Sequence, residues 1–182
     1  MKKLVILAII LLPIIGTAQK VITREGHANI FSHTTAEDIS ADNYKVTSAI
    51  NKETGSMVFS IPVQSFEFEK ALMQKHFNQP NFMDSKKFPK IKFKGTIDNL
   101  SAVNWTKDGT YEVNVSGDLT IRAVTKSISE TGTITVNDGT ITAESTFTVK
   151  GIGEYGVGKP KSKKKKNNVA DDIKITFKGV YK

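Results

Sequence analysis

Residues 111–121, YEVNVSGDLTI, place an apolar residue or glycine at every odd position and a polar residue at every even position. Successive residues of a β-strand point to opposite faces of a sheet, so this pattern predicts a strand with one buried and one exposed face. Residues 91–98, IKFKGTID, alternate in the same way. These two runs are the clearest strands of the chain, and their period of two identifies the remaining strands.

Six further runs share this alternation, and two of the segments between them carry turn signals. The runs are residues 28–32, 44–50, 57–63, 128–136, 141–149 and 173–177. Asn51–Gly55 and the Asp-Gly pair in Asn137–Thr140 predict β-hairpins. Eight strands with one apolar face predict an all-β fold, either a barrel or a sandwich. The number of strands favours a closed eight-stranded antiparallel barrel, whose interior can hold an apolar ligand.

The inner face of this barrel follows from the alternation, except at the first strand. Gly95, Gly117, Ala143 and Ser145 fall on the inner face among large residues, so we expect them to leave room in the lumen. Ile30 and Phe31 are both large and apolar and must point in opposite directions, so the pattern does not decide the inner face there.

One segment, between the third and fourth strands, breaks the strand pattern. In residues 66–77, Phe66, Met73 and Phe77 fall at helical spacing, which predicts a helix with Ser65 as its N-cap and an end at Pro80. This helical insertion is expected either to cap one end of the barrel or to form a flap on its side.

The first 18 residues have the features of a signal peptide. Lys2 and Lys3 precede an apolar stretch from Leu4 to Ile15, and residues 16–18 are small. The apolar stretch is shorter than the roughly 20 residues of a spanning helix, although an uncleaved anchor is the alternative. We therefore expect export, cleavage before Gln19 and a single domain over residues 19–182. The chain has no cysteine, so disulfides cannot contribute to its stability.

The formal net charge is +8, and lysine is concentrated in residues 159–168, KPKSKKKKNN. Like charges repel and nothing apolar can be buried there, so this segment is expected to be an exposed loop. One hypothesis is that Lys163, Lys164, Lys165 and Lys166 contact anionic lipid head groups; the alternative is a solvated loop. Binding of nucleic acid is disfavoured, because only Tyr155 supplies a nearby aromatic ring.

Two motifs resemble those of the YceI-like, polyisoprenoid-binding family. They are residues 66–95, with FEFEKALMQKHFN followed by FMDS and FPKIKFKG, and residues 117–126, GDLTIRAVTK. The resemblance extends from about Gly26 to Val180. It implies a lipocalin-like antiparallel barrel in the bacterial periplasm, an isoprenoid chain in the lumen and no catalytic residues. The chain departs from the family pattern at Ala123, where glycine is usual, and in residues 150–157, KGIGEYGV, which lack an arginine often found there.

The strand pattern, the helical insertion and this resemblance together predict an apolar ligand site for an isoprenoid lipid of polyprenol or quinone type. The candidate ligand-binding residues are Ile30, Phe59, Ile61, Phe68, Leu72, Met73, Phe77, Phe82, Ile91, Phe93, Leu119, Ile121, Phe147, Val149, Tyr155, Ile175 and Phe177. The alternative is that these residues fill an ordinary core, in a structural barrel that docks on anionic envelope surfaces through the lysine segment. A homodimer is left open.

The sequence carries no pattern typical of an enzyme. His27, His33 and His76 are far apart and do not have metal-ligand spacing. No nucleophile elbow or phosphate loop is present, and the glycines of residues 151–156 precede the lysine segment instead of a helix. We therefore predict a binding protein without a catalytic residue, a metal or a cofactor other than the bound lipid.

Overall fold

A computed structural model describes residues 19–34, 37–158 and 170–182. Its strands are β1 (Lys20–His33), β2 (Asp38–Asn51), β3 (Ser56–Pro62), β4 (Glu67–Phe68), β5 (Lys90–Ile97), β6 (Gly109–Ile121), β7 (Val124–Asn137), β8 (Thr140–Val149) and β9 (Ile173–Tyr181). The helix α1 (Ala71–Phe77) and the short 3₁₀ helices η1 (Val63–Ser65), η2 (Leu100–Ala102) and η3 (Ile152–Tyr155) complete the described elements. Within these residues, no helix is long and apolar enough to cross a bilayer.

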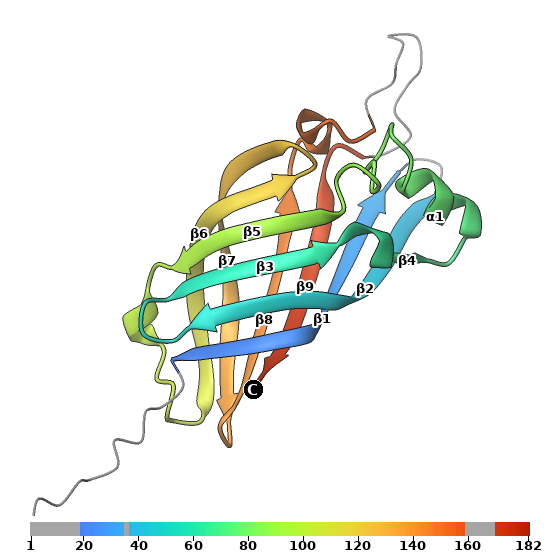
Figure 1. The fold of residues 1–182 in the computed structure, drawn as a ribbon. Coiled ribbons are helices and arrows are strands. Elements are labelled where there is room, and N and C mark those ends of the chain that lie inside the picture. Colours follow the sequence, from blue (N-terminus) through green and yellow to red (C-terminus); the bar gives the residue numbers. More distant parts are fainter. Residues whose placement is uncertain (1–18, 35–36, 159–169) are drawn as a thin grey trace, which may run out of the picture.

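Eight of the strands form a closed antiparallel barrel (Figure 1). The strand order is β1-β9-β8-β7-β6-β5-β3-β2, and β2 pairs with β1 to close the ring. The two-residue β4 stands outside the ring. It pairs with β2 in antiparallel orientation, with Phe68 opposite Ala41. The expected eight-stranded barrel is therefore confirmed over a sandwich, and the helical insertion lies between β3 and β5.

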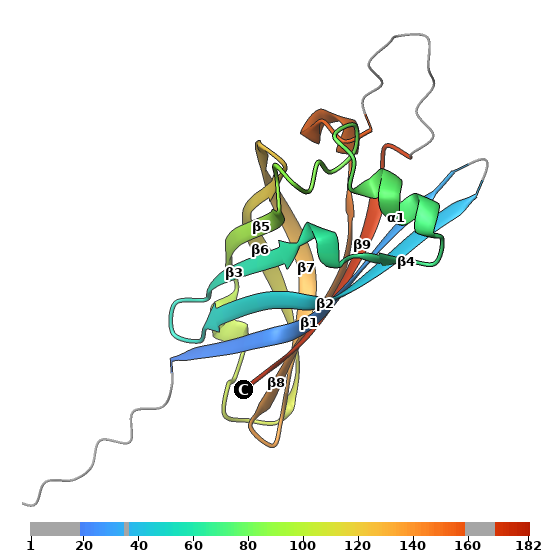
Figure 2. The same ribbon diagram turned by 45° about the vertical axis from the view of Figure 1, so that its right-hand side comes forward.

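The first two strands are longer than their apolar alternation indicates. β1 and β2 pair from Lys20 opposite Asn51 to His33 opposite Asp38, with irregularities in register on either side of Gly26. A bulge shifts the alternation by one residue, which explains why the beginning of β1 does not show a clean period of two. The far end of this pair extends beyond the ring toward α1 and β4 (Figure 2).

Both expected hairpins are present. Asp138 and Gly139 have φ angles of 47° and 73°, which are the left-handed values that a tight two-residue hairpin turn needs. In the turn between β2 and β3, the Asn51 side-chain oxygen accepts hydrogen bonds from the backbone N–H groups of Glu53 and Thr54, and Gly55 has a φ of 70°. Local turn chemistry alone was therefore sufficient to place these reversals.

The helix in the insertion is shorter than expected, and Ser65 is not its N-cap. Ser65 ends η1, Phe66 is extended at φ −72° and ψ 129°, and α1 begins only after Lys70. Phe66 is buried and Phe68 pairs with β2, so tertiary contacts favour extended backbone over the helical spacing of the phenylalanines. The helix ends at Phe77, before Pro80.

The insertion caps one end of the barrel, at the same end as η3 (Figures 1 and 2). Phe77 of α1 packs its ring against Phe66 and Phe68, at ring-centre distances of 5.5 and 4.9 Å. At the opposite end, the core includes Val46, Ile50 and Tyr181, and the Tyr181 hydroxyl donates a 2.8 Å hydrogen bond to the Ser48 hydroxyl. The two ends of the barrel therefore differ, because one is filled by core side chains and the other is covered by the insertion.

Candidate functional site

The barrel encloses an apolar cavity of about 140 Å³, the barrel chamber. Its wall is built mainly from residues of β3, β5, β6, β7, β8 and β9. Three rings, those of Phe59, Phe93 and Phe177, are packed edge to face in this wall, with Phe59 4.9 Å from Phe177 and 5.9 Å from Phe93. Aromatic rings prefer this edge-to-face arrangement, so the three rings give this part of the wall a defined shape.

A second cavity of about 440 Å³, the cap chamber, lies between the insertion and the end of the barrel. It is lined by α1, by Phe31 and Ile39 of the β1–β2 extension, by Ile152 and Val157 near η3, and by Ile173 of β9. Leu72 of α1 lines it although this residue is 63% exposed, so the chamber reaches solvent beside the helix.

Five residues line both chambers and form a collar between them. The collar residues are Ile30, Phe66, Ile91, Ile121 and Ile175. Because the same side chains line both chambers, the two chambers adjoin at the collar and follow one another from the helix into the barrel. Two adjoining apolar chambers in this arrangement suit an extended apolar chain better than a compact ligand.

The structure brings most of the candidate residues together around these two chambers. The barrel chamber is lined by Phe59, Ile61, Phe93, Leu119, Phe147 and Phe177, the cap chamber by Phe68, Leu72, Met73, Phe77 and Phe82, and both by Ile30, Ile91, Ile121 and Ile175. Val149 and Tyr155 line neither chamber. Both are buried in one core cluster, to which η3 contributes Tyr155 itself, and burial raises the pKa of Tyr155. That any of these side chains contacts a ligand stays a prediction.

Two details of the wall differ from expectation. Phe31 lines the cap chamber and its neighbour Ile30 lines both chambers, so the assumption of one apolar face does not hold where β1 extends past the ring. Gly95 and Gly117 leave no free room in the lumen. A Cβ atom on either residue would lie within 2.8 Å of the Phe93 ring, so the glycines make space for that ring. Ala143 and Ser145 do line the barrel chamber.

Arg122 fixes the loops that cover the cap chamber, a role that the sequence did not reveal. Its guanidinium donates hydrogen bonds to the backbone carbonyls of Phe82 at 2.8 Å, Pro80 at 3.2 Å and Gly156, and it lies 3.9 Å from the Asp84 carboxylate. These acceptors belong to two loops that are far apart in the sequence. The resemblance contained Arg122 as part of a motif, but only the structure shows which segments it joins.

A second polar contact lies at the rim of the cap chamber. Lys70, just before α1, donates a 2.6 Å hydrogen bond to the Glu37 carboxylate, and this contact raises the pKa of Lys70. Both side chains are exposed and both line the chamber. Solvent screens an exposed ion pair, so it is a weak link between the cap and the β1–β2 extension.

Sequence reasoning also missed the polar part of the barrel chamber. Glu130, Thr131 and Thr133 of β7 and Glu144 of β8 line it. Glu130 was detectable, because it is in phase with the inward-facing Ile128 and Ile134 and so places a carboxyl group on an otherwise apolar face.

The histidines lie in separate environments. His27 is 2.7 Å from the Asp42 carboxylate, His33 is 2.5 Å from that of Asp38, and His76 lines the cap chamber. The described part of the chain contains no group of three or more His, Cys, Asp or Glu residues that could hold a metal ion. The proposed lipid-contact residues Lys163, Lys164, Lys165 and Lys166 and the expected signal peptide lie outside the described residues.

The family model of the YceI-like domain matches residues 18–181. The chain belongs to the YceI-like family. This confirms the resemblance stated from the two sequence motifs. No curated protein matches the sequence.

Solved structures share the fold of this YceI-like chain. A polyisoprenoid-binding domain from Saccharophagus degradans, implicated in plant cell wall breakdown, has a TM-score of 0.73 at 10% identity, over 90% of this chain and 98% of its own. BcnA of Burkholderia cenocepacia has a TM-score of 0.69 at 20% identity, over 86% and 96%. The YceI protein of Campylobacter jejuni has a TM-score of 0.54 at 19% identity, over 87% and 84%.

Proposed function

We propose that this YceI-like protein is a periplasmic carrier or storage protein that holds an isoprenoid lipid of polyprenol or quinone type in its two-chamber cavity. The observation that carries the proposal is the pair of adjoining, mainly apolar chambers, the cap chamber and the barrel chamber, which share the collar residues. The polyisoprenoid-binding domain among the fold neighbours supports the same ligand class.

Burial of the lipid chain provides enough free energy for such a role. A buried methylene contributes about 0.8 kcal/mol, so one five-carbon isoprene unit contributes roughly 3–4 kcal/mol before ordering costs. A few units in contact with the phenylalanine and isoleucine walls are therefore sufficient for tight binding. The cavity walls provide apolar contact along most of their length, so we assign the site binding and no chemical step.

Delivery of the lipid is proposed to involve a membrane surface. The features of residues 1–18 favour export, and the lysines at 163–166 favour contact with anionic head groups. Lysines near an anionic surface contribute about 1 kcal/mol each, enough for reversible docking while the lipid is exchanged.

Mass spectrometry of an organic extract of the purified mature protein tests the binding function. We expect a stoichiometric isoprenoid in the organic extract, or uptake after incubation with a mixture of quinones and polyprenols. Ile175→Trp places a large side chain in the collar and should abolish uptake, whereas Lys174→Trp, on the exposed face of the same strand, should not. Wild-type protein that stays empty in both experiments would instead support a filled structural barrel.

A further inference from the structure

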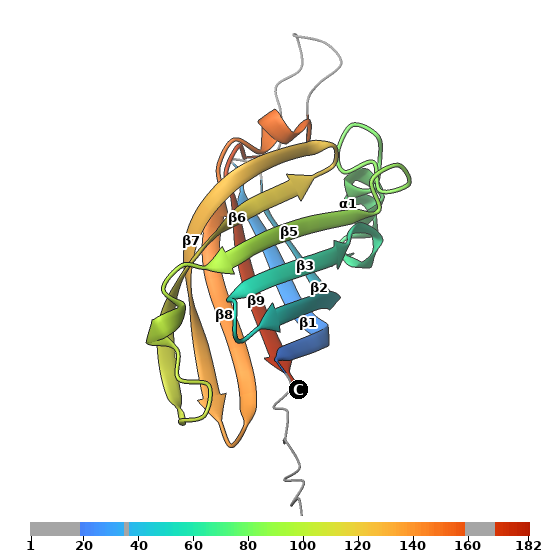
Figure 3. The ribbon, with the colours of Figure 1, turned by 60° about the vertical axis from the view of Figure 1, so that its left-hand side comes forward.

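The wall of the barrel is incomplete between β7 and β8. β7 pairs with β6 along its length up to Val124, and β8 pairs with β9 up to Val149. Between them, however, the ladder runs only from Asn137 opposite Thr140 to Thr133 opposite Glu144. Residues 124–132 of β7 and 145–149 of β8 therefore face each other without strand pairing, and we call this region the seam. Figures 1 and 3 show β7 curving toward β6 at this end.

The backbone geometry changes at the last pair of the ladder. Beyond it, the Ser145 hydroxyl donates a 2.6 Å hydrogen bond to the Thr131 carbonyl. A hydrogen bond from a side chain to the backbone thus stands where the next pair of the ladder would be. A Cβ atom on Gly132 would lie 2.7 Å from the Glu144 carbonyl oxygen. Glycine is therefore needed where the two backbones are still close, immediately before they separate.

The barrel chamber reaches the outer surface at the seam. In a closed wall, the side chains that line a lumen are those at inward-facing positions, because successive side chains point to opposite faces. Here the chamber is lined by inward-facing Ile128, Glu130 and Phe147, and also by Thr131 and Glu144, which are exposed residues of the alternate positions. The lining of the barrel chamber therefore includes exposed residues at the seam, and we place a second mouth there, in addition to the one beside α1.

Glu130 is the polar group that this mouth presents to the lumen. It lies opposite Val115 of β6, and the described residues give its carboxylate no hydrogen-bond partner. Burial raises the pKa of Glu130, while the charge of Lys150 acts in the opposite direction. Glu144 is paired with Lys178 at 2.8 Å and Lys126 with Glu154, so Lys150 is the cation whose charge acts on Glu130. Glu130 is thus available to a ligand.

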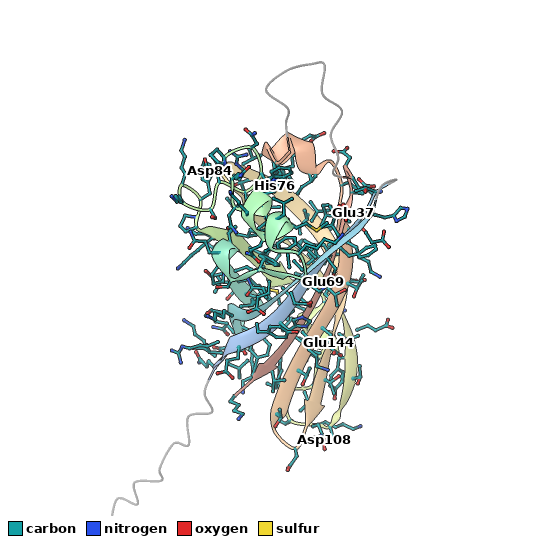
Figure 4. All side chains as sticks on the ribbon, turned by 90° about the vertical axis from the view of Figure 1, so that its right-hand side faces the viewer. Glu37, Glu69, His76, Asp84, Asp108 and Glu144 are labelled. Atoms are coloured by element: carbon teal, nitrogen blue, oxygen red, sulfur yellow. The ribbon has the colours of Figure 1, made fainter. Side chains whose placement is uncertain are left out.

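The two mouths differ in their charged residues. Lys70, its ion-pair partner Glu37 and His76 line the mouth beside α1, whereas the chamber residues at the seam include Glu130 and Glu144 and no lysine. Figure 4 shows Glu144 well separated from Glu37 and His76 along the long axis of the molecule. A polar head group held at the seam would therefore meet hydrogen-bond acceptors.

We propose that the seam is a lateral mouth of the cavity, and that Glu130 there accepts a hydrogen bond from the polar end of the bound lipid and so selects an uncharged, hydroxyl-bearing head group over a phosphorylated one. The inference rests on the proposed lipid-binding function. A hydroxyl can donate to a carboxylate, whereas a phosphate carries the same sign of charge and is repelled.

Competition binding with geranylgeraniol and geranylgeranyl monophosphate tests this assignment, using a fluorescent prenyl lipid as the reporter. We expect the wild-type protein to prefer the alcohol by about tenfold or more, since like charges a few ångströms apart repel appreciably even under surface screening. Glu130→Gln should reduce this preference and Glu130→Lys should reverse it. Glu112→Lys, at an exposed position of β6, makes the same charge change as a control and should leave the preference unaltered. Circular dichroism verifies that each variant is folded.

The outcomes separate the seam from the lipid-binding function itself. Wild-type protein that binds the lipids with a preference unaffected by Glu130→Gln and Glu130→Lys would overturn the seam assignment and leave lipid binding intact. The same holds if the wild-type protein prefers the phosphate. Wild-type protein that binds neither prenyl lipid would overturn the proposed function together with this inference.

Discussion

Replacing Arg122 with alanine should loosen the cap without changing the barrel. The Arg122 side chain is only 17% exposed and joins the loop of residues 80–84 to the loop after η3. The substitution removes three hydrogen bonds to backbone carbonyls and leaves Asp84, which is 19% exposed, without its cationic neighbour. Arg122 has a φ of 55°, but alanine and lysine keep a Cβ atom there, so backbone strain cancels in the comparison.

The expected cost follows from these contacts. A hydrogen bond to a charged group contributes about 1.5–3 kcal/mol, but water can replace part of it at loops near the surface. We therefore expect Arg122→Ala to lower the free energy of unfolding by about 2–4 kcal/mol in total. For a domain of this size the melting temperature should fall by roughly 4–16 °C. The free energy of unfolding of Arg122→Lys should lie between those of the wild-type protein and Arg122→Ala, because an ammonium group cannot span the same three acceptors.

Urea denaturation and lipid-release kinetics measure the two consequences. The release rate should rise in Arg122→Ala, because the loops that carry Phe82 and Val157 over the cap chamber lose their common anchor. Arg24→Ala is the matched control, since Arg24 is the other arginine of the chain and is exposed on β1. If Arg122→Ala and Arg24→Ala have the same stability and the same release rate, the assignment of Arg122 as an anchor is refuted.

Three other predictions concern the barrel and its surface. Burial raises the pKa of Tyr181 from 10.0 to about 12 in the folded protein. The resulting contribution to the free energy of unfolding, about 2–3 kcal/mol, is fully present below pH 10 and should be lost as the pH rises from about 10 to 12. Tyr181→Phe should remove this pH dependence and cost about 1 kcal/mol at neutral pH by unpairing Ser48, as measured by urea denaturation. Gly117→Ala should destabilise the protein by more than about 2 kcal/mol in thermal melts, because the new Cβ atom would lie 2.4 Å from the Gly95 Cα atom. Gly153→Ala is the control and should not destabilise it, because its new Cβ atom would lie 3.5 Å from the nearest atom, Oδ1 of Asp171. Glutamine at residues 163–166 should weaken sedimentation with anionic vesicles and leave neutral vesicles unaffected, and equal binding to both would contradict the lysine hypothesis.

The sequence by itself determined the strands, their hairpins and the family. Residues 91–98 and 111–121 became β5 and β6 almost as predicted, because alternation reports directly which face of a strand can be buried. Asp138-Gly139 placed a reversal because its left-handed backbone is a local property. Local signals failed in residues 66–68, where the burial of Phe66 and the pairing of β4 decided the backbone.

The chambers were decided only by the tertiary structure. Alternation shows that a side chain faces inward, but free volume depends on which side chains from other strands occupy the same space. Gly117 illustrates the difference, since the Phe93 ring of the adjacent strand takes the space that glycine leaves. The seam was likewise decided only by the tertiary structure. Glu130 was visible in the sequence as a polar residue on an apolar face, but only the end of the β7–β8 ladder shows that it stands at an opening, because strand separation is a property of two distant segments together.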